Sequence, residues 1–121
     1  MKKLILIVDD DPMITNTYKR ILNKEGFEIK VITTGVSALS EAKKRIFDLI
    51  LLDIGLPDIN GIEVCSKFRQ DIDNKYTPII IITGYDDPQE VVIAMKSGAD
   101  DYITKPIDKS ILIEKINALL I

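Results

Sequence analysis

Acidic residues follow two of the apolar runs in the sequence, and their type and spacing suggest metal chemistry. Asp9 and Asp10 follow the run at residues 4–8, and Asp53 follows the run at residues 49–52. Carboxylates held at close range repel one another, so such a group takes up protons or binds a cation. A site with only oxygen ligands suits a hard cation. Mg²⁺ is favoured because a few carboxylates, water and a phosphate oxygen satisfy it.

A hydroxyl and a lysine follow two later apolar runs. Thr83 follows residues 78–82, and Lys105 comes shortly after residues 102–103. A carboxylate such as Asp53 can act as a nucleophile and form an aspartyl phosphate. A lysine would supply fixed positive charge to the phosphoryl group, and a threonine hydroxyl would donate a hydrogen bond to one of its oxygens. Together these residues predict phosphoryl transfer assisted by Mg²⁺.

Several of these residues also have a purely structural interpretation. Asp11 precedes Pro12 and is therefore expected to be the N-cap of a helix rather than a ligand. Asp53 alone could be a turn residue at the end of a strand, and Thr83 or Lys105 alone is weak evidence for a site. Only their combination indicates function.

The chain contains no histidine, which excludes several kinds of site within it. A Ser-His-Asp triad, a histidine-ligated zinc site and a phosphohistidine carrier all need that side chain. Any chemistry must therefore use carboxylates, lysine, hydroxyls and the backbone.

Five short apolar segments alternate with helical patterns and would position these residues. The expected strands are residues 3–8, 28–32, 48–52, 78–82 and 102–103. They are continuously apolar, which is typical of strands covered on both faces in a parallel sheet. The expected helices contain Ile14, Tyr18, Ile21 and Leu22, then residues 36–45, 61–70 and 88–97, and finally Leu112, Ile116, Leu119 and Leu120. This alternation predicts an open α/β sheet wound on both faces, with the site at the carboxyl ends of its strands.

Local signals mark the ends of some of these elements. Asp87, directly before Pro88, is expected to cap the fourth helix. Gly26 and Gly98 are expected to end the first and fourth helices, and residues 71–77 are expected to form a polar surface loop.

Composition limits the remaining possibilities. The length of 121 residues, with 46% hydrophobic and 29% charged residues, predicts one globular domain spanning residues 1–121. A net charge of −3 argues against direct nucleic-acid binding. No segment approaches the roughly 18 apolar residues of a membrane span, and the first apolar run is too short for a signal peptide. The single cysteine, Cys65, is expected to be a buried thiol, and the cytoplasm is the expected location.

Four motifs, in this order, closely resemble bacterial two-component response-regulator receiver domains of the chemotaxis-regulator type. They are VDDDP at 8–12, LLDIGLPDING at 51–61, ITG at 82–84 and SGADDYITKP at 97–106. The resemblance covers the whole chain. It implies a flavodoxin-like fold, with a five-stranded parallel sheet in the order 2-1-3-4-5 and five helices.

The resemblance also implies roles for the site residues. Asp53 would accept a phosphoryl group from a phosphohistidine on a sensor histidine kinase or a histidine phosphotransfer protein. Mg²⁺ would be bound by Asp10, by Asp53 and by the carbonyl of Gly55, with Asp9 acting mostly through water. Thr83 and Lys105 would contact the phosphoryl group. Such a protein is not a turnover enzyme, since it only takes a phosphoryl group from a donor and later loses it.

A conformational switch is implied as well. Tyr102 would turn inward as Thr83 moves towards the phosphate, and the bond between Lys105 and Pro106 is expected to be cis. The fourth helix, fifth strand and fifth helix would then contact a downstream protein or an output domain, with the chain a monomer or a phosphorylation-dependent dimer. Ile111 and Ile113 are candidates to add apolar area there, although packing at the edge of the core also explains them.

Two positions depart from the common family pattern. Gly55 stands two residues after the acceptor, where a larger side chain is frequent, and this affects how water reaches the phosphoryl group. Tyr85, two residues after Thr83, has a bulky side chain that could cover part of the site.

Three functions therefore remain open. The first is a stand-alone receiver or phosphorelay intermediate, and the second is the N-terminal receiver of a longer regulator with a DNA-binding or enzymatic output domain. The third is a Mg²⁺-dependent aspartyl phosphohydrolase, which is disfavoured because the haloacid-dehalogenase pattern needs an acid where Gly55 stands. A nucleotide-binding domain is disfavoured further, since acids rather than a glycine-rich loop follow Val8.

Overall fold

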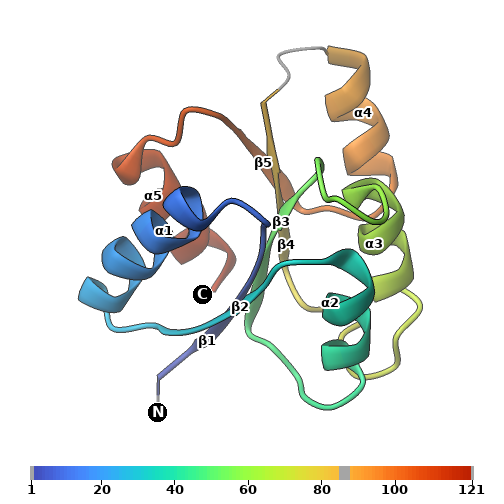
Figure 1. The fold of residues 1–121 in the computed structure, drawn as a ribbon, viewed down its shortest axis with the longest axis horizontal. Coiled ribbons are helices and arrows are strands. Elements are labelled where there is room, and N and C mark those ends of the chain that lie inside the picture. Colours follow the sequence, from blue (N-terminus) through green and yellow to red (C-terminus); the bar gives the residue numbers. More distant parts are fainter. Residues whose placement is uncertain (1, 85–87, 121) are drawn as a thin grey trace.

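Five parallel strands form one sheet in the order β2-β1-β3-β4-β5, and five helices cover its two faces (Figure 1). This computed structural model describes residues 2–84 and 88–120. The strands are β1 (Leu4–Val8), β2 (Glu28–Ile32), β3 (Leu49–Asp53), β4 (Ile79–Thr83) and β5 (Asp101–Thr104). The helices are α1 (Pro12–Lys24), α2 (Gly35–Ala42), α3 (Gly61–Phe68), α4 (Pro88–Lys96) and α5 (Lys109–Leu119). The predicted fold class and strand order are confirmed.

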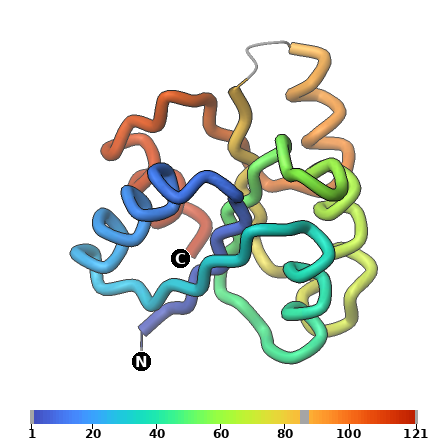
Figure 2. Tube along the Cα trace, in the orientation of Figure 1, coloured from blue at the N-terminus to red at the C-terminus, as the bar shows by residue number. Residues whose placement is uncertain are grey.

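The helices form two layers on opposite faces of the sheet. Helices α1 and α5 lie together on one face, and α2, α3 and α4 lie on the other, as the tube in Figure 2 also shows. Successive residues of a strand point to opposite faces. In β1, Ile5 and Ile7 therefore pack with α1 and α5, whereas Leu6 and Val8 pack with the other layer.

The central strands are buried on both faces, as their sequences predicted. Every residue of β1, β3 and β4 is buried. Strand β2 is different, because Glu28 is exposed and the rest of the strand is only partly buried. Strand β2 lies at one edge of the sheet, and β5, which is also mostly only partly buried, lies at the other. The expectation that all strands are fully covered was therefore wrong for β2 and β5. The sequence of β2, EIKVI, carries the charged residues Glu28 and Lys30, whereas β1 and β4 carry none, so these charges are a signal of the edge position.

Side-chain caps fix where most of the helices begin. Asp11 caps α1, as predicted, by accepting a hydrogen bond from the N–H of Met13 at 2.9 Å. Thr34, Asn60 and Asp108 cap α2, α3 and α5 in the same way. The predicted cap of α4 by Asp87 lies outside the described residues.

Helices α2 and α3 end earlier than predicted. Their last residues are Ala42 and Phe68, where the sequence suggested 45 and 70. The chain leaves α2 in time to bury Phe47, whose side chain is 2% exposed. Gly26 and Gly98 follow α1 and α4 with φ of 90° and 114°, which confirms them as helix stops.

The connection between α3 and β4 is not the polar surface loop that was predicted. Asn74 is fully buried, and its amide nitrogen donates to the carbonyls of Ala42 (2.8 Å) and Arg45 (3.1 Å). Its side-chain oxygen accepts from the N–H of Phe47 (3.0 Å) and from the hydroxyl of Thr77 (3.1 Å). The loop is therefore built around a buried amide that ties it to the segment before β3.

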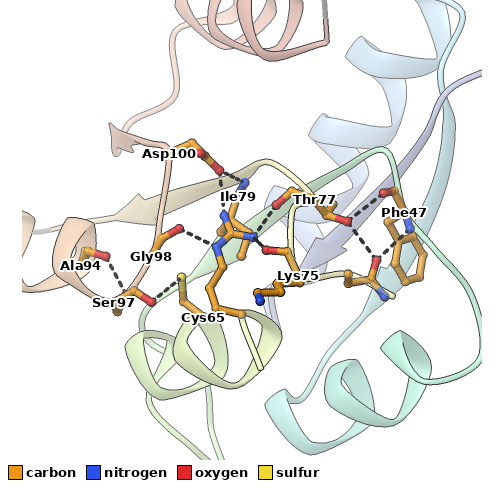
Figure 3. A network of polar contacts seen from close by, with 11 residues as sticks. Phe47, Cys65, Lys75, Thr77, Ile79, Ala94, Ser97, Gly98 and Asp100 are labelled. Carbon is orange, nitrogen blue, oxygen red and sulfur yellow. Dashed lines mark hydrogen bonds and ion pairs between the residues drawn. The ribbon is translucent and has the colours of Figure 1, made fainter. Parts of the chain in front are cut away.

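Arg69, directly after α3, is hydrogen-bonded to two other segments, residues 75–77 and 98–100, at the amino end of the sheet. Its guanidinium donates to three carbonyls and one carboxylate: Gly98 (2.8 Å), Lys75 (3.1 Å), Thr77 (2.7 Å) and Asp100 Oδ2 (2.8 Å). Figure 3 shows these acceptors around one centre, with Ile79 donating its N–H to Asp100 Oδ2 at 2.8 Å. A Cβ at position 98 would lie 2.6 Å from the Arg69 side chain, so glycine is needed there for this approach.

No helix within residues 2–84 and 88–120 has both the length and the apolar character needed to cross a lipid bilayer.

Candidate functional site

The carboxyl ends of β1, β3, β4 and β5 meet at one edge of the sheet and bring the predicted site residues together. A pocket at this edge is lined by residues that follow these four strands, among them Asp9, Asp10, Asp53, Gly55, Gly84 and Lys105. The sheet positions them because parallel strands present all their carboxyl ends at the same edge. The strand order places β3, which ends in Asp53, between β1 and β4.

Three of the acids form a compact cluster. One carboxylate oxygen from each of Asp9, Asp10 and Asp53 lies within 4.8 Å of the others. Asp9 and Asp53 are buried, whereas Asp10 is exposed. The sequence predicted this clustering from strand ends alone, and the structure brings all three acids together.

Asp9 is the most buried of these acids. Its Oδ1 accepts the N–H of Asp11 at 3.0 Å, while its buried Oδ2 has no hydrogen-bond partner among the described residues. Burial raises the pKa of Asp9, and the charges of Asp53 and Asp10 raise it further, although the Asp11 N–H and Lys105 oppose this. A buried carboxylate oxygen without a partner is unfavourable. The arrangement fits a bound cation, which would satisfy this oxygen and reduce the repulsion.

Lys105 is the positive group of the site. Its Nζ lies 3.4 Å from Asp53 Oδ1 and 4.0 Å from Asp9 Oδ2. Asp53 Oδ1 also accepts the N–H of Gly55 at 3.3 Å. One oxygen of Asp53 therefore faces a lysine and a backbone donor, and the same side chain belongs to the acid cluster.

Thr83 lies at the same edge, as the last residue of β4. It is 2% exposed, and Gly84, the next residue, lines the pocket. In the sheet register, Asp53 is opposite Ile82, the residue before Thr83. Thr83 is therefore next to the acid cluster in the sheet. Tyr85 lies outside the described residues.

Tyr102 is on β5, away from the pocket lining. Its ring is partly buried against the α2–α4 layer, and Lys115 Nζ lies 5.1 Å from the ring centroid. Lys115 also donates to the Tyr102 carbonyl at 2.8 Å and forms an ion pair with Asp101 at 3.0 Å. These contacts place Tyr102 beside Lys115 of α5, on a strand of the surface expected to signal, and its switching role stays a prediction.

The remaining sequence expectations can be located directly. The peptide bond between Lys105 and Pro106 is cis, as predicted. Gly55 is exposed, and a Cβ at that position would meet nothing within 4 Å. Cys65 is fully buried, and burial raises the pKa of its thiol.

Two residues near the site were missed at the sequence level. Asp58 holds the loop after β3 to the start of α2, through hydrogen bonds to the N–H groups of Gly35 and Val36. Tyr18 was predicted as part of an apolar stripe, yet its buried hydroxyl has no hydrogen-bond partner among the described residues. The only sequence signal for the role of Asp58 was the turn-forming pair of Pro57 and Asp58. No sequence signal indicated the environment of the Tyr18 hydroxyl.

Comparisons with known proteins agree with this geometry. Residues 5–117 match the family model of the response regulator receiver domain. The DNA-binding response regulator MtrA of Mycolicibacterium smegmatis is 40% identical over 120 residues, which cover 99% of this chain and 51% of MtrA. The chain thus spans about half the length of the curated relatives it matches.

Solved structures show the same fold. A CheY-like response regulator receiver domain from Methanospirillum hungatei superposes with a TM-score of 0.92 at 38% identity, covering 99% of this chain and 94% of that one. The receiver domain of the sensor histidine kinase PA1611 from Pseudomonas aeruginosa also has a TM-score of 0.92, at 23% identity with 99% and 98% covered. That structure has a magnesium ion coordinated in its active-site cleft.

Proposed function

The chain belongs to the response regulator receiver domain family, a family of two-component signalling switches, and we propose from this premise that Asp53 is its phosphoryl acceptor. The observation that carries the proposal is the environment of Asp53. Its carboxylate lies in the cluster with Asp9 and Asp10, and one of its oxygens is 3.4 Å from Lys105 Nζ. A nucleophilic carboxylate beside a fixed positive charge is suited to phosphoryl transfer.

The acid cluster would hold Mg²⁺. Asp10, Asp53 and the Gly55 carbonyl are the proposed direct ligands, and Asp9 would act mostly through water. An all-oxygen donor set with an unsatisfied buried oxygen suits this hard cation. When bound, the ion would neutralise charge on the entering phosphoryl group.

The protein's own residues would perform the transfer as follows. A carboxylate oxygen of Asp53 attacks the phosphorus of the donor and forms a P–O bond, while the bond from phosphorus to the leaving group breaks with its electron pair. The donor is a phosphohistidine of a sensor kinase or phosphotransfer protein, or acetyl phosphate in the test tube. Lys105 compensates the negative charge of the phosphoryl oxygens, and Thr83 donates a hydrogen bond to one of them. Hydrolysis by water later restores the carboxylate.

The phosphorylated state would be read on the surface formed by α4, β5 and α5. This surface carries exposed apolar side chains, including Ile93 and Ile111, which are 50% and 45% exposed. Phosphorylation would favour one of two arrangements of Thr83, α4 and Tyr102, because only that arrangement lets Thr83 contact the phosphoryl group. A downstream protein, an output domain or a second copy of the chain would bind the favoured arrangement.

The same switch serves two kinds of protein. One is a receiver that itself binds a downstream protein or passes on its phosphoryl group. The other is a receiver joined to an output domain. The second has specific support, since MtrA is named a DNA-binding response regulator and this chain matches about half of its length. The reading frame beyond codon 121 of the gene distinguishes the two.

Phosphorylation by acetyl phosphate tests the site. With Mg²⁺ present, the intact mass is expected to rise by one phosphoryl group, and Asp53→Asn should abolish the increase. Asp108→Asn is the matched control, because it changes an exposed acid that caps α5 outside the site. Full labelling of the Asp53→Asn variant would refute the assignment. Sustained release of phosphate from an added phosphoester, at an enzyme's rate, would instead support an aspartyl phosphohydrolase.

A further inference from the structure

The loop that leaves the acid cluster is fastened to a neighbouring helix by one carboxylate. Residues 54–60 connect β3 to α3. Asp58 in this loop accepts two hydrogen bonds at 2.9 Å, to Oδ1 from the N–H of Gly35 and to Oδ2 from the N–H of Val36. These are the first two residues of α2, whose N–H groups have no partner within the helix. A carboxylate there is also favoured by the helix dipole.

Packing beneath this contact makes it specific. A Cβ at Gly35 would lie 2.5 Å from Ile59 Cγ1 and 2.8 Å from Val64 Cγ2, so only glycine allows the loop and α2 to approach this closely. Ile59 packs against the buried core of the α2–α4 layer. The N–H groups of Val36 and Gly35 also hold the pKa of Asp58 below its usual value, so the carboxylate stays ionised. Although Asp58 is exposed, the next residue, Ile59, is partly buried against this core and helps to place its backbone.

The same loop is connected to Asp53 at its other end. The carbonyl of Ile54 accepts the N–H of Leu56 at 3.0 Å and that of Gly61 at 2.9 Å, which closes the loop on itself. A Cβ at Gly61 would collide with the backbone carbonyl oxygen of Asp53. Only Leu56 and Pro57 separate Gly55 from Asp58, and the ring of Pro57 restricts its backbone. A displacement of Asp58 therefore reaches Gly55 through a short, constrained segment.

We infer that Asp58 is a positioning residue for the magnesium site, because its two hydrogen bonds to α2 fix the loop that supplies Gly55. The inference rests on the proposed function, in which the Gly55 carbonyl is a ligand. It extends that function by making the placement of α2 relative to the loop a determinant of metal affinity. In its two hydrogen bonds, the side chain of Asp58 contacts none of the proposed ligands of the ion.

Calorimetric titration with MgCl₂ tests the inference. Asp58→Ala should weaken Mg²⁺ binding by about 3- to 10-fold, less than the loss usual for a residue that touches a metal ligand directly. Asp58→Asn keeps one acceptor oxygen and should recover part of the loss. Thr34→Ala removes the other cap of α2, the bond from the N–H of Ser37, without touching the loop. Asp108→Ala removes an equivalent cap from α5. Both controls should bind Mg²⁺ like the wild type.

Amide hydrogen exchange supplies a second readout that does not depend on the metal. Asp58→Ala should increase exchange at Gly35 and Val36 in the metal-free protein, whereas Asp108→Ala should not. Equal Mg²⁺ affinity in the wild type and both Asp58 variants would overturn the inference while leaving the proposed site intact. Equal weakening in Asp58→Ala and Thr34→Ala would also overturn it, since capping of α2 alone would then explain the effect. Two other results would instead overturn the proposed function. One is a wild type that binds no Mg²⁺, and the other is Mg²⁺ binding that is unchanged when Asp10 is replaced by alanine.

Discussion

Asp9 combines burial with a carboxylate oxygen that no hydrogen bond among the described residues satisfies. Its neighbours Asp53 and Asp10 add repulsion, and Lys105, 4.0 Å away, offsets only part of it. In the absence of a cation, the ionised cluster therefore works against folding. Residues that suit a metal ion commonly cost stability when the ion is missing.

Asp9→Asn should accordingly stabilise the metal-free protein at neutral pH. Removing one charge from the cluster is expected to raise the free energy of unfolding by about 1–2 kcal/mol, the size of a close charge pair in a partly solvated environment. The pKa of Asp9 is higher in the folded chain than the ordinary value of 3.8, so its ionisation favours the unfolded state. The advantage of the variant should be absent below about pH 3.8 and grow as the pH rises.

Urea unfolding of both proteins in EDTA, across a pH series, measures this effect. Asp10→Asn is the comparison within the cluster, and it should gain less because Asp10 is exposed. Added Mg²⁺ should stabilise the wild type more than Asp9→Asn. A variant that is less stable than the wild type at neutral pH would contradict the account of Asp9.

At the residue scale, the sequence predicted the functional side chains that come directly after a strand. It did not predict hydrogen bonds between residues that are far apart in the chain. Asp9, Asp10, Asp53 and Lys105 could be grouped because strand ends meet at one edge of a parallel sheet. The bonds of Asp58 join residues 22 and 23 positions apart, and no local pattern encodes them.

At the scale of elements, the loop at residues 71–77 shows how a polar sequence can be misread. Its composition resembles a solvated connection, yet Asn74 is fully buried and uses both ends of its amide. A buried amide is compatible with the core only because backbone groups satisfy it. Those groups belong to Ala42, Arg45 and Phe47, so the loop fixes how α2 leads into β3.

Asn74→Ala should therefore destabilise the fold by about 2–4 kcal/mol, because it leaves several buried backbone groups without partners. Asp73→Ala, at the exposed neighbouring position, should change the free energy of unfolding by less than about 0.5 kcal/mol. Urea unfolding at pH 7 compares the two. Similar free energies of unfolding for both variants would show that the amide of Asn74 contributes little to stability.

At the scale of the whole molecule, the carboxyl ends and the amino ends of the strands carry different polar groups. The carboxyl edge carries the acid cluster with its repulsive charges, while the amino edge carries the dense hydrogen bonds of Arg69 and Asn74 (Figure 3). Arg69 connects the end of α3 with the following loop and with the segment before β5, whose Asp100 also accepts the N–H of Ile79 at the start of β4. The hydrogen-bond networks of Arg69 and Asn74 thus lie at the end of the sheet opposite the site.

Arg69→Ala should lower the free energy of unfolding by about 2–3 kcal/mol. Arg69→Lys should lower it by most of that amount, because an ammonium group cannot reproduce the planar fork that contacts four acceptors. Both variants should keep wild-type Mg²⁺ affinity where they are folded, since the contacts lie at the opposite edge. Urea unfolding and calorimetric titration measure the two properties. A lysine variant as stable as the wild type, or one with altered Mg²⁺ affinity, would contradict this separation.

The architecture as a whole could be predicted from the sequence because it follows from periodicity. Continuous apolar runs gave the buried strands, and apolar spacing gave the helices, whereas the strand order came from the family resemblance. The edge positions of β2 and β5 follow from that strand order, whereas the burial of Asn74 could not be predicted, because it depends on which distant segment covers the residue. The Arg69 contacts span up to 31 positions and have the same limitation.

The open space around Gly55 gives the molecule a practical use as a sensor scaffold. A Cβ placed there would meet nothing within 4 Å, and the native Cys65 is fully buried, with burial raising the pKa of its thiol. A cysteine introduced by Gly55→Cys would thus be the only thiol that a dye reaches readily in the folded chain. A fluorophore attached at that point would sit at the rim of the acid cluster and report its occupancy without removal of the native cysteine.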